Sequence, residues 1–188
     1  AFARPLEPRD EVIPLNEDEL AAILEHGGQF DSYFSAYEQR PQQIEMLKAV
    51  TRALTNGQHL LVEAGTGVGK SFAYLIPAAM WAYQNQHRVV ISTNTINLQD
   101  QLVRKDLPDL CAATDLNLRA AVLKGRNNYL CPRRLEAFVT RGPDNSDEMR
   151  VVAKTMTWMY LGGTGDRNEI NLNGTVEREI WKRIRSEE

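Results

Sequence analysis

The amino-acid sequence alternates between two patterns of apolar residues. Short apolar runs at residues 60–64, 88–93 and 118–123 are typical of buried strands, while residues 70–84 and 95–107 between them carry apolar positions at helical spacing. Parallel strands must be joined by crossover segments of about this length, which are usually helices. The alternation therefore predicts an α/β fold in which a parallel sheet is flanked by helices.

Helical patterns also lie on both sides of this region. Before it, Asn16 followed by three acidic residues predicts a short capped helix, and residues 41–56 predict a longer helix that begins at a proline and ends before a glycine. After it, residues 132–140, 147–160 and 175–185 predict three more helices.

These patterns predict three parts. Residues 1–15 carry three prolines among charged residues, which favours an extended connector. We expect the connector and the short N-terminal helix at residues 1–29, the α/β domain at residues 30–130 and a helical insertion at residues 131–188.

Four aromatic residues at positions 30–37 recur at helical spacing, which favours packing in the core.

Composition narrows the class of protein. Of the 188 residues, 43% are hydrophobic and 25% are charged, as in ordinary globular proteins. No apolar stretch approaches the roughly 20 residues of a membrane-spanning helix, no signal-peptide pattern opens the chain, and two cysteines give no disulfide framework. We therefore expect a cytoplasmic protein with no membrane partner. The net charge of −3 confines any contact with nucleic acid to local patches.

A glycine-rich turn follows the first apolar run. It matches the phosphate-binding pattern G-x-x-x-x-G-K-[ST], with alanine at the first position, over Ala64, Gly65, Thr66, Gly67, Val68, Gly69, Lys70 and Ser71. In such a turn, backbone N–H groups point at phosphate oxygens and the next helix adds the positive end of its dipole. Lys70 is expected to reach the β- and γ-phosphates of ATP, and the Ser71 hydroxyl to bind Mg²⁺. The pattern predicts an ATPase in which Lys70 and Ser71 act on the phosphates.

Two other classes of protein could carry this turn. A P-loop kinase or other phosphotransferase would hold a lid and an acceptor site in a chain of about this length, and it would be indifferent to DNA. A nucleic-acid-binding module could retain a vestigial phosphate loop. Replacement of Lys70 by alanine separates the classes, because it abolishes nucleotide binding in an ATPase and leaves DNA binding unchanged in a simple binder.

Three further segments surround the turn in a fixed order. Residues 37–43 precede it, residues 91–102 follow the second apolar run, and residues 123–134 follow the third. Over about residues 37–135 the chain resembles the DinG branch of the XPD-like superfamily 2 DNA helicases. This resemblance implies the first part of a RecA-like P-loop NTPase domain, followed by the start of a helical insertion, in an ATP-dependent DNA helicase.

The resemblance gives the first of these segments a role in binding the base of ATP. Arg40 and Gln43 are similar to the family's adenine-recognition element, and a glutamine amide suits that role because it both donates and accepts hydrogen bonds. Tyr37 is placed either to cover the base or to pack in the core.

The second segment is similar to a motif that contacts single-stranded DNA. The resemblance places Thr93 and Asn94, with Gln99, at the phosphates of the strand. Uncharged donors hold a phosphate more weakly than fixed cations do, which suits a motor that releases its track in every cycle. The alternative role for Thr93 and Asn94 is to cap the next helix.

The third segment carries four cations without an intervening acid. Lys124, Arg126, Arg133 and Arg134 surround Tyr129. Cations that follow the backbone and an aromatic ring that stacks on a base are typical of single-stranded nucleic acid binding. The alternative is an ordinary solvated surface.

Cys131 resembles the first of four cysteines that hold an iron–sulfur cluster in many XPD-like helicases. One thiolate cannot hold a 4Fe-4S cluster, which takes four cysteine ligands. Cys111 matches no ligand position, so the remaining ligands would have to follow Glu188. A branch of the family without the cluster keeps similar sequence here, and both alternatives stay open.

Two features that the resemblance implies for a complete helicase are absent from this sequence. No apolar strand ends in Asp-Glu, the Walker B element that binds Mg²⁺, and there is no second RecA-like domain. We therefore expect a piece of a longer protein that binds nucleotide weakly and does not hydrolyse it efficiently alone. The expected partners are single-stranded DNA, followed in the 5′→3′ direction, and the rest of the polypeptide, including a second RecA-like domain and, in some relatives, an upstream exonuclease-like domain.

Overall fold

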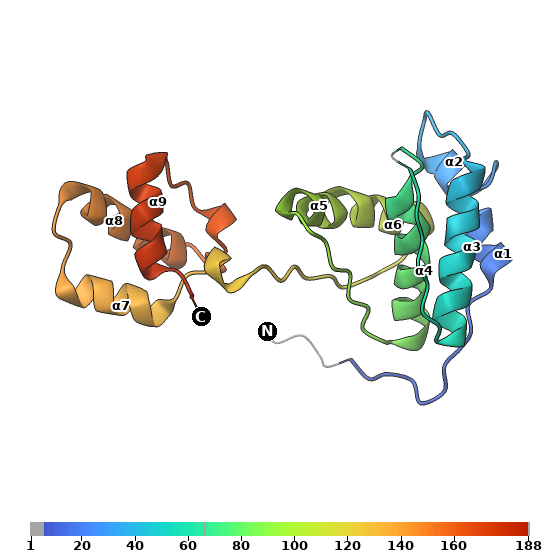
Figure 1. Cartoon of the computed structure of the whole chain (residues 1–188), viewed down its shortest axis with the longest axis horizontal. Coiled ribbons are helices and arrows are strands. Elements are labelled where there is room, and N and C mark those ends of the chain that lie inside the picture. The colour runs from blue at the N-terminus through green and yellow to red at the C-terminus, as the bar shows by residue number, and fades with distance from the viewer. Residues whose placement is uncertain (1–5, 66, 188) are drawn as a thin grey trace. The chain divides into compact units, whose positions relative to one another are not determined.

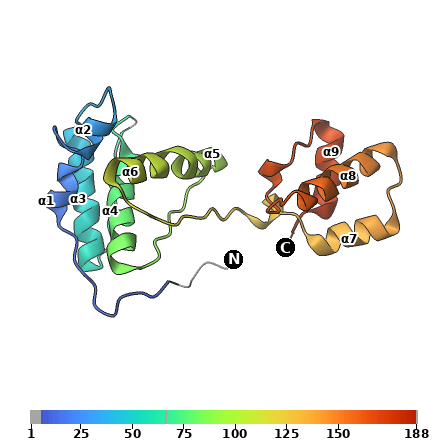
Figure 2. The same ribbon diagram turned by 180° about the vertical axis from the view of Figure 1, so that it is seen from behind.

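The computed structural model of the chain describes residues 6–65 and 67–187. Its contacts divide the chain into two compact units, which we name unit 1 (residues 1–122) and unit 2 (residues 123–188). Figures 1 and 2 show the ribbon from opposite sides. None of the described helices combines the length and the apolar content that crossing a bilayer requires.

Unit 1 consists of helices joined by extended segments. The last three of its helical elements follow one another without a break, so the helix predicted over residues 95–107 continues to residue 114 with a π-helical turn in its middle. The elements are α1 (Glu17–Ala22), α2 (Gln29–Tyr33), α3 (Pro41–Asn56), α4 (Lys70–Asn85), α5 (Ile96–Gln101), the π-helix η1 (Leu102–Asp106) and α6 (Leu107–Thr114).

Capping residues explain where the first and third helices begin and end. The side chain of Asn16 accepts the backbone N–H of Asp18 at 3.0 Å, which satisfies a donor in the first turn of α1. Pro41 opens α3 with its fixed φ, and Gly57 ends it in the left-handed region at φ 62°. The helices predicted from Asn16 and over residues 41–56 are confirmed.

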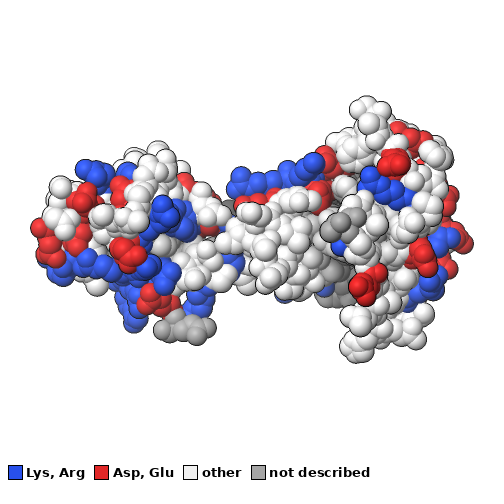
Figure 3. All heavy atoms as spheres, turned by 45° about the horizontal axis from the view of Figure 1, so that its top comes forward, with Lys and Arg blue, Asp and Glu red and all other residues white. Residues whose placement is uncertain are grey.

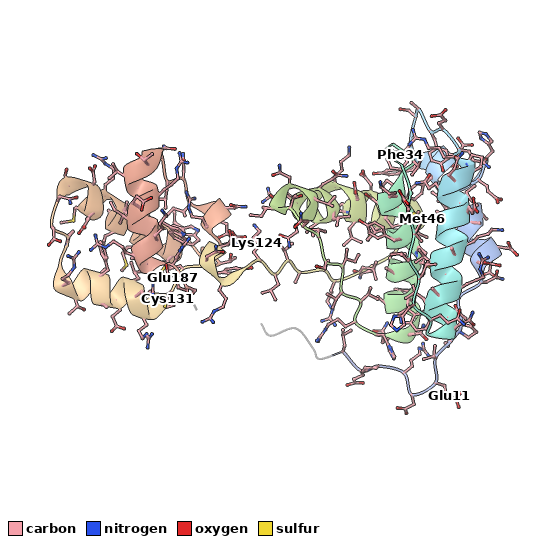
Figure 4. All side chains as sticks on the ribbon, viewed as in Figure 1. Glu11, Phe34, Met46, Lys124, Cys131 and Glu187 are labelled. Carbon is pink, nitrogen blue, oxygen red and sulfur yellow. The ribbon has the colours of Figure 1, made fainter. Side chains whose placement is uncertain are left out.

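An aromatic cluster forms part of the core of unit 1, in which α3 and α4 lie side by side (Figure 1). Phe30 is only 1% exposed, and its ring meets those of Phe34, Tyr37 and Phe72 edge-on at centroid distances of 5.3, 6.3 and 4.8 Å. Figure 4 labels Phe34 and Met46, which pack against this core from the end of α2 and from α3. The core packing predicted for the aromatic residues at 30–37 is confirmed for Phe30, Phe34 and Tyr37.

The described part of the N-terminal connector, residues 6–15, contains no helix, bends at residues 10–11 and is attached to the end of α4, with Leu15 buried in the core. The side chain of Asn85, fully buried, accepts the N–H of Ile13 at 2.7 Å and donates to its carbonyl at 3.2 Å. The backbone N–H of Arg9 donates to the backbone carbonyl of Asn85 at 3.1 Å. Glu11, which Figure 4 labels, lies in the connector between Arg9 and Ile13. The side-chain amide of Asn85 thus bonds to both the N–H and the carbonyl of Ile13 and holds the connector to the end of α4.

The predicted parallel sheet is wrong for the described residues. They contain no strand, and the only β-pairing among them consists of two isolated bridges, both in unit 2. The apolar runs at residues 60–64, 88–93 and 118–123 are extended segments that form no ladder with one another.

The exposure of these apolar runs explains why the prediction of buried strands was wrong. Leu61, Val90 and Leu123 are 99%, 82% and 84% exposed, so the runs do not contribute the core that a buried sheet would provide. An apolar run is compatible with a strand, but a strand forms only when a second backbone segment supplies hydrogen bonds. The sequence of the run does not identify that second segment. In unit 1 the helices and their aromatic side chains bury one another instead.

Unit 2 is a small group of three helices around its own core. Val151 and Ile184 are 0% and 1% exposed there, and Trp181 packs beside them. The helices are α7 (Pro132–Arg141), α8 (Ser146–Tyr160) and α9 (Gly174–Ile184), with the 3₁₀ turns η2 (Arg126–Asn128) and η3 (Arg167–Glu169). The three helices predicted for this region agree with these bounds to within one residue at each end.

Two buried glutamates connect the helices of unit 2. Glu148 on α8 accepts hydrogen bonds from Arg141 on α7, at 2.8 Å, and from Arg183 on α9. Glu177 on α9 accepts from Lys154 on α8 at 2.8 Å. A backbone N–H of the preceding turn, together with the two guanidinium groups, lowers the pKa of Glu148, and the Lys154 ammonium lowers the pKa of Glu177. Both carboxylates are therefore charged at neutral pH. Glu148 joins all three helices, and Glu177 joins α9 to α8.

Candidate functional site

The glycine-rich turn lies in unit 1, between an extended segment and the first residue of α4. Gly67 and Gly69 have φ of 81° and 76°, in the left-handed region that favours glycine. Gly69 is also the N-cap of α4, so the amides of the turn lead directly into the positive end of a helix. Thr66 lies outside the described residues. The backbone is thus left-handed at Gly69, which the pattern requires to be glycine, and at Gly67, which the pattern leaves free.

Lys70, at the start of α4, folds back over the turn. Its Nζ donates to the carbonyl oxygens of Ala64 at 2.8 Å and Gly65 at 3.0 Å, while its side chain remains open to solvent. A negatively charged phosphate oxygen is a stronger acceptor for an ammonium group than a neutral carbonyl oxygen is. Lys70 is therefore within the turn and needs only to release two carbonyls to reach an anion.

Arg40 and Gln43 also reach the turn, from the start of α3. Nη1 of Arg40 donates to the carbonyl of Gly67 at 2.6 Å, and Nε2 of Gln43 donates to the carbonyl of Gly69 at 2.8 Å. The structure thus brings both predicted base-binding residues to the predicted phosphate loop. Sequence reasoning placed them near a bound nucleotide but missed these contacts with the loop carbonyls.

Ser71 and Tyr37 occupy different environments. Ser71 is half-buried on α4, one helical turn before Tyr74; burial raises the pKa of Tyr74, and the nearby Ser71 hydroxyl opposes the rise. Tyr37 lies in the aromatic core, where its hydroxyl donates to the carbonyl of Leu24 at 2.7 Å and burial raises the pKa of Tyr37. Core packing, rather than an open position over a base, is what the structure shows for Tyr37.

The segment before α5 leaves Asn94 exposed and Thr93 half-buried. The cap of α5 is Thr95, whose hydroxyl accepts the N–H of Leu98 at 3.3 Å. Thr93 donates to the carbonyl of Thr95 at 3.2 Å, and Asn94 and Gln99 make no side-chain hydrogen bond within the described residues. Thr93 and Asn94 are therefore not the helix cap.

The four predicted cations of unit 2 have unequal surroundings. The side chain of Lys124 is 4% exposed and its Nζ lies 2.7 Å from a carboxylate oxygen of Asp166, a partner that the sequence did not indicate. Its backbone N–H also donates to the hydroxyl of Tyr129 at 2.9 Å. Lys124 therefore serves the packing of unit 2, in the extended segment where Figure 4 labels it.

The remaining three cations reach the surface. Arg134 pairs with Glu187 at 2.9 Å, whereas Arg126 and Arg133 are exposed and form no ion pair in the described ranges 6–65 and 67–187. Figure 3 shows Lys and Arg side chains interspersed with Asp and Glu over the visible face of unit 2. Among the described residues, the basic run thus offers two exposed cations outside any ion pair, a third that is paired with Glu187, and a fourth that is buried.

Cys131 precedes α7 and is half-buried; its N–H donates to the carbonyl of Ile184 at 2.9 Å, so it lies beside the segment that ends at Glu187 (Figure 4). Cys111 lies in the other unit, on α6, where burial raises the pKa of its thiol. The described residues contain no group of three His, Cys, Asp or Glu side chains that could hold a metal ion. A four-iron cluster takes four thiolates, so the residues present do not form its site.

Comparisons with known proteins identify a helicase family over a range that includes the glycine-rich turn. Residues 40–141 match the DEAD/DEAH box helicase family. The chain is 34% identical to the 3'-5' exonuclease DinG of Bacillus subtilis, over 95% of this chain and 20% of that protein. It is 37% identical to the ATP-dependent DNA helicase YoaA of Haemophilus influenzae, over 81% of this chain and 23% of the relative.

A third relative is the ATP-dependent helicase DinG of Mycobacterium tuberculosis, 40% identical over 77% of this chain and 24% of the relative. The chain thus spans about a fifth to a quarter of the length of these curated relatives. The match at residues 40–141 begins at Arg40 and includes the whole glycine-rich turn. This chain belongs to the DEAD/DEAH box helicase family, and its relatives are DinG and YoaA helicases.

Proposed function

We propose that this chain is the ATP-binding part of an ATP-dependent DNA helicase that couples ATP hydrolysis to movement along single-stranded DNA, with 5′→3′ polarity. The observation that carries the proposal is the turn from Ala64 to Ser71, which ends in the lysine and the helix start that a triphosphate requires. Family membership and the names of the relatives support the same activity.

In the proposed complex, the phosphates lie against the amides of the turn. Lys70 leaves its two carbonyls for the β- and γ-phosphates, and the Ser71 hydroxyl turns from Tyr74 to Mg²⁺. The carbonyl Oε1 of Gln43 forms no hydrogen bond within the described residues, which leaves it to accept from the amino group of adenine. Arg40 lies next to it at the start of α3.

Contacts with single-stranded DNA are proposed separately for each unit. In unit 1 three polar side chains before and within α5 suit phosphate oxygens, as hydrogen-bond donors without charge: Asn94 is exposed, and Thr93 and Gln99 are half-buried. In unit 2 the exposed guanidinium groups of Arg126 and Arg133 are the best placed cations, and Arg134 can join them by leaving Glu187. Tyr129 is half-buried and its hydroxyl is engaged, which limits it to stacking through its ring.

The remaining partners belong to the longer protein. We propose a second RecA-like domain that completes the ATPase site, and, since the Bacillus subtilis relative is named an exonuclease, a nuclease domain in some members. Cys131 can supply at most one ligand to an iron–sulfur cluster, so no step of the proposed activity is assigned to one. We also propose a cytoplasmic location, with which a DNA substrate is compatible.

The proposal is tested by ATP hydrolysis in the intact parent protein, with and without single-stranded DNA. We expect DNA to raise the hydrolysis rate several-fold, because strand binding and ATP turnover are coupled in a translocating motor. A rate that responds to a small-molecule acceptor and ignores DNA would favour the phosphotransferase alternative. DNA binding that persists without any ATPase activity would favour a binding module with a vestigial loop.

A further inference from the structure

Two side chains from outside the glycine-rich turn hold carbonyl oxygens inside it. Arg40 is the N-cap residue of α3 and donates to the carbonyl of Gly67 at 2.6 Å, while Gln43, one turn into α3, donates to the carbonyl of Gly69 at 2.8 Å. The two acceptors are the two described glycines of the turn with positive φ. These are the positions where the backbone has most freedom to rotate away from a binding geometry.

Holding a carbonyl also fixes an amide. In a trans peptide the C=O and the N–H are part of one plane and point in opposite directions, and the chain has no cis peptide bond in its described residues. The bond from Arg40 to the Gly67 carbonyl therefore sets the direction of the Val68 N–H. The bond from Gln43 to the Gly69 carbonyl likewise sets the direction of the Lys70 N–H. Both amides belong to the segment that is to face the phosphates.

The second contact is tightly enclosed. Gln43 is only 5% exposed, and a β-carbon built on Gly69 would lie 2.4 Å from its Nε2. A side chain at Gly69 would therefore displace the amide that holds the carbonyl. Since Gln43 sits on α3, which packs along α4, its position is fixed by the two helices that frame the turn.

We propose that Arg40 and Gln43 are positioning residues for phosphate binding, and that they hold the Val68 and Lys70 amides toward the anion whether or not a base is present. The inference rests on the proposed nucleotide site and adds a role distinct from adenine recognition. Donors that are already oriented lose little freedom on binding, which raises affinity for the anion itself. The Nε2 group that holds Gly69 is not available to a base at the same time.

The test compares a ligand with a base and a ligand without one. Calorimetric titration of the full chain with Mg-ATP and with magnesium tripolyphosphate is carried out on the wild type and on Gln43→Met, which keeps the side-chain length but removes both polar groups. We expect Gln43→Met to weaken magnesium tripolyphosphate about fivefold to tenfold, the effect of one net hydrogen bond, and Mg-ATP at least as much, because the proposed bond from adenine to Oε1 is also lost. Gln42→Met, at an exposed position on the same helix, is the matched control and should change neither affinity.

A second pair of variants covers the case in which Gln43→Met does not fold, which thermal unfolding would reveal. Arg40 is half-exposed, so Arg40→Met removes the bond to Gly67 at a position that tolerates substitution, and Arg40→Lys retains a donor. We expect tripolyphosphate binding to fall in Arg40→Met and to be partly restored in Arg40→Lys. Loss of Mg-ATP affinity with unchanged tripolyphosphate affinity in the folded variants would overturn the inference and leave the proposed function intact. A wild-type chain that binds neither ligand would overturn both.

Discussion

Replacement of Lys70 by alanine should weaken Mg-ATP binding by about 100-fold. In the proposed complex the ammonium exchanges the carbonyls of Ala64 and Gly65 for phosphate oxygens, so the variant loses charge-assisted bonds of about 1.5–3 kcal/mol each. A loss of about 2.7 kcal/mol corresponds to 100-fold in affinity. Titration of both proteins with Mg-ATP measures the difference, and ATP hydrolysis by the intact parent should fall at least as much.

Lys48→Ala is the matched control. Lys48 on α3 pairs with Asp18 of α1 at 2.6 Å and makes no hydrogen bond with the described residues of the turn. Removing it takes away the same positive charge, so a general electrostatic effect on ATP would appear in both variants. Equal affinity in Lys70→Ala and wild type would show that the triphosphate is not held by this loop.

Replacement of Phe30 by alanine should destabilise unit 1 by about 3–5 kcal/mol, the usual cost of truncating a buried phenylalanine. The ring is 1% exposed and contacts Phe34, Tyr37 and Phe72, and Phe72 lies two residues beyond Lys70 on α4. The variant therefore loosens the support of the helix that carries the phosphate loop. Thermal unfolding should show the transition of unit 1 lowered on the order of 10 °C or more.

The aromatic control for this change is Tyr160→Ala in unit 2. Tyr160 is 90% exposed at the end of α8, so its removal should alter the free energy of unfolding by no more than about 0.5 kcal/mol. A similar loss in both variants would mean that the exposure of these side chains does not govern their contribution. An unchanged unit 1 transition in Phe30→Ala would contradict the aromatic core described above.

Local features of this fold could be predicted from sequence because nearby residues determine them. The start of α1 at Asn16, the end of α3 at Gly57 and the beginning of α4 at Lys70 each depend on one capping residue and its neighbours. The glycine-rich turn was identified for the same reason, since two glycines with positive φ and the following lysine are contiguous.

Features that depend on distant residues could not be predicted. The apolar run around Leu61 gave no indication of whether another backbone would pair with it, and the described structure supplies none. The basic run at residues 124–134 looked uniformly available, yet Lys124 is buried against Asp166, 42 positions away. The contacts of Arg40 and Gln43 with the turn cross 27 and 26 positions and leave no periodic pattern.

The most direct test of the central claim is a titration of the isotope-labelled chain with Mg-ATP, followed by the amide resonances of the backbone. We predict saturable shifts at Gly65, Gly67, Val68, Gly69 and Lys70, because the phosphates contact those N–H groups, and no such shifts in Lys70→Ala. Saturable shifts confined to other parts of unit 1, or an unchanged spectrum at millimolar Mg-ATP, would contradict the claim that this turn binds the triphosphate.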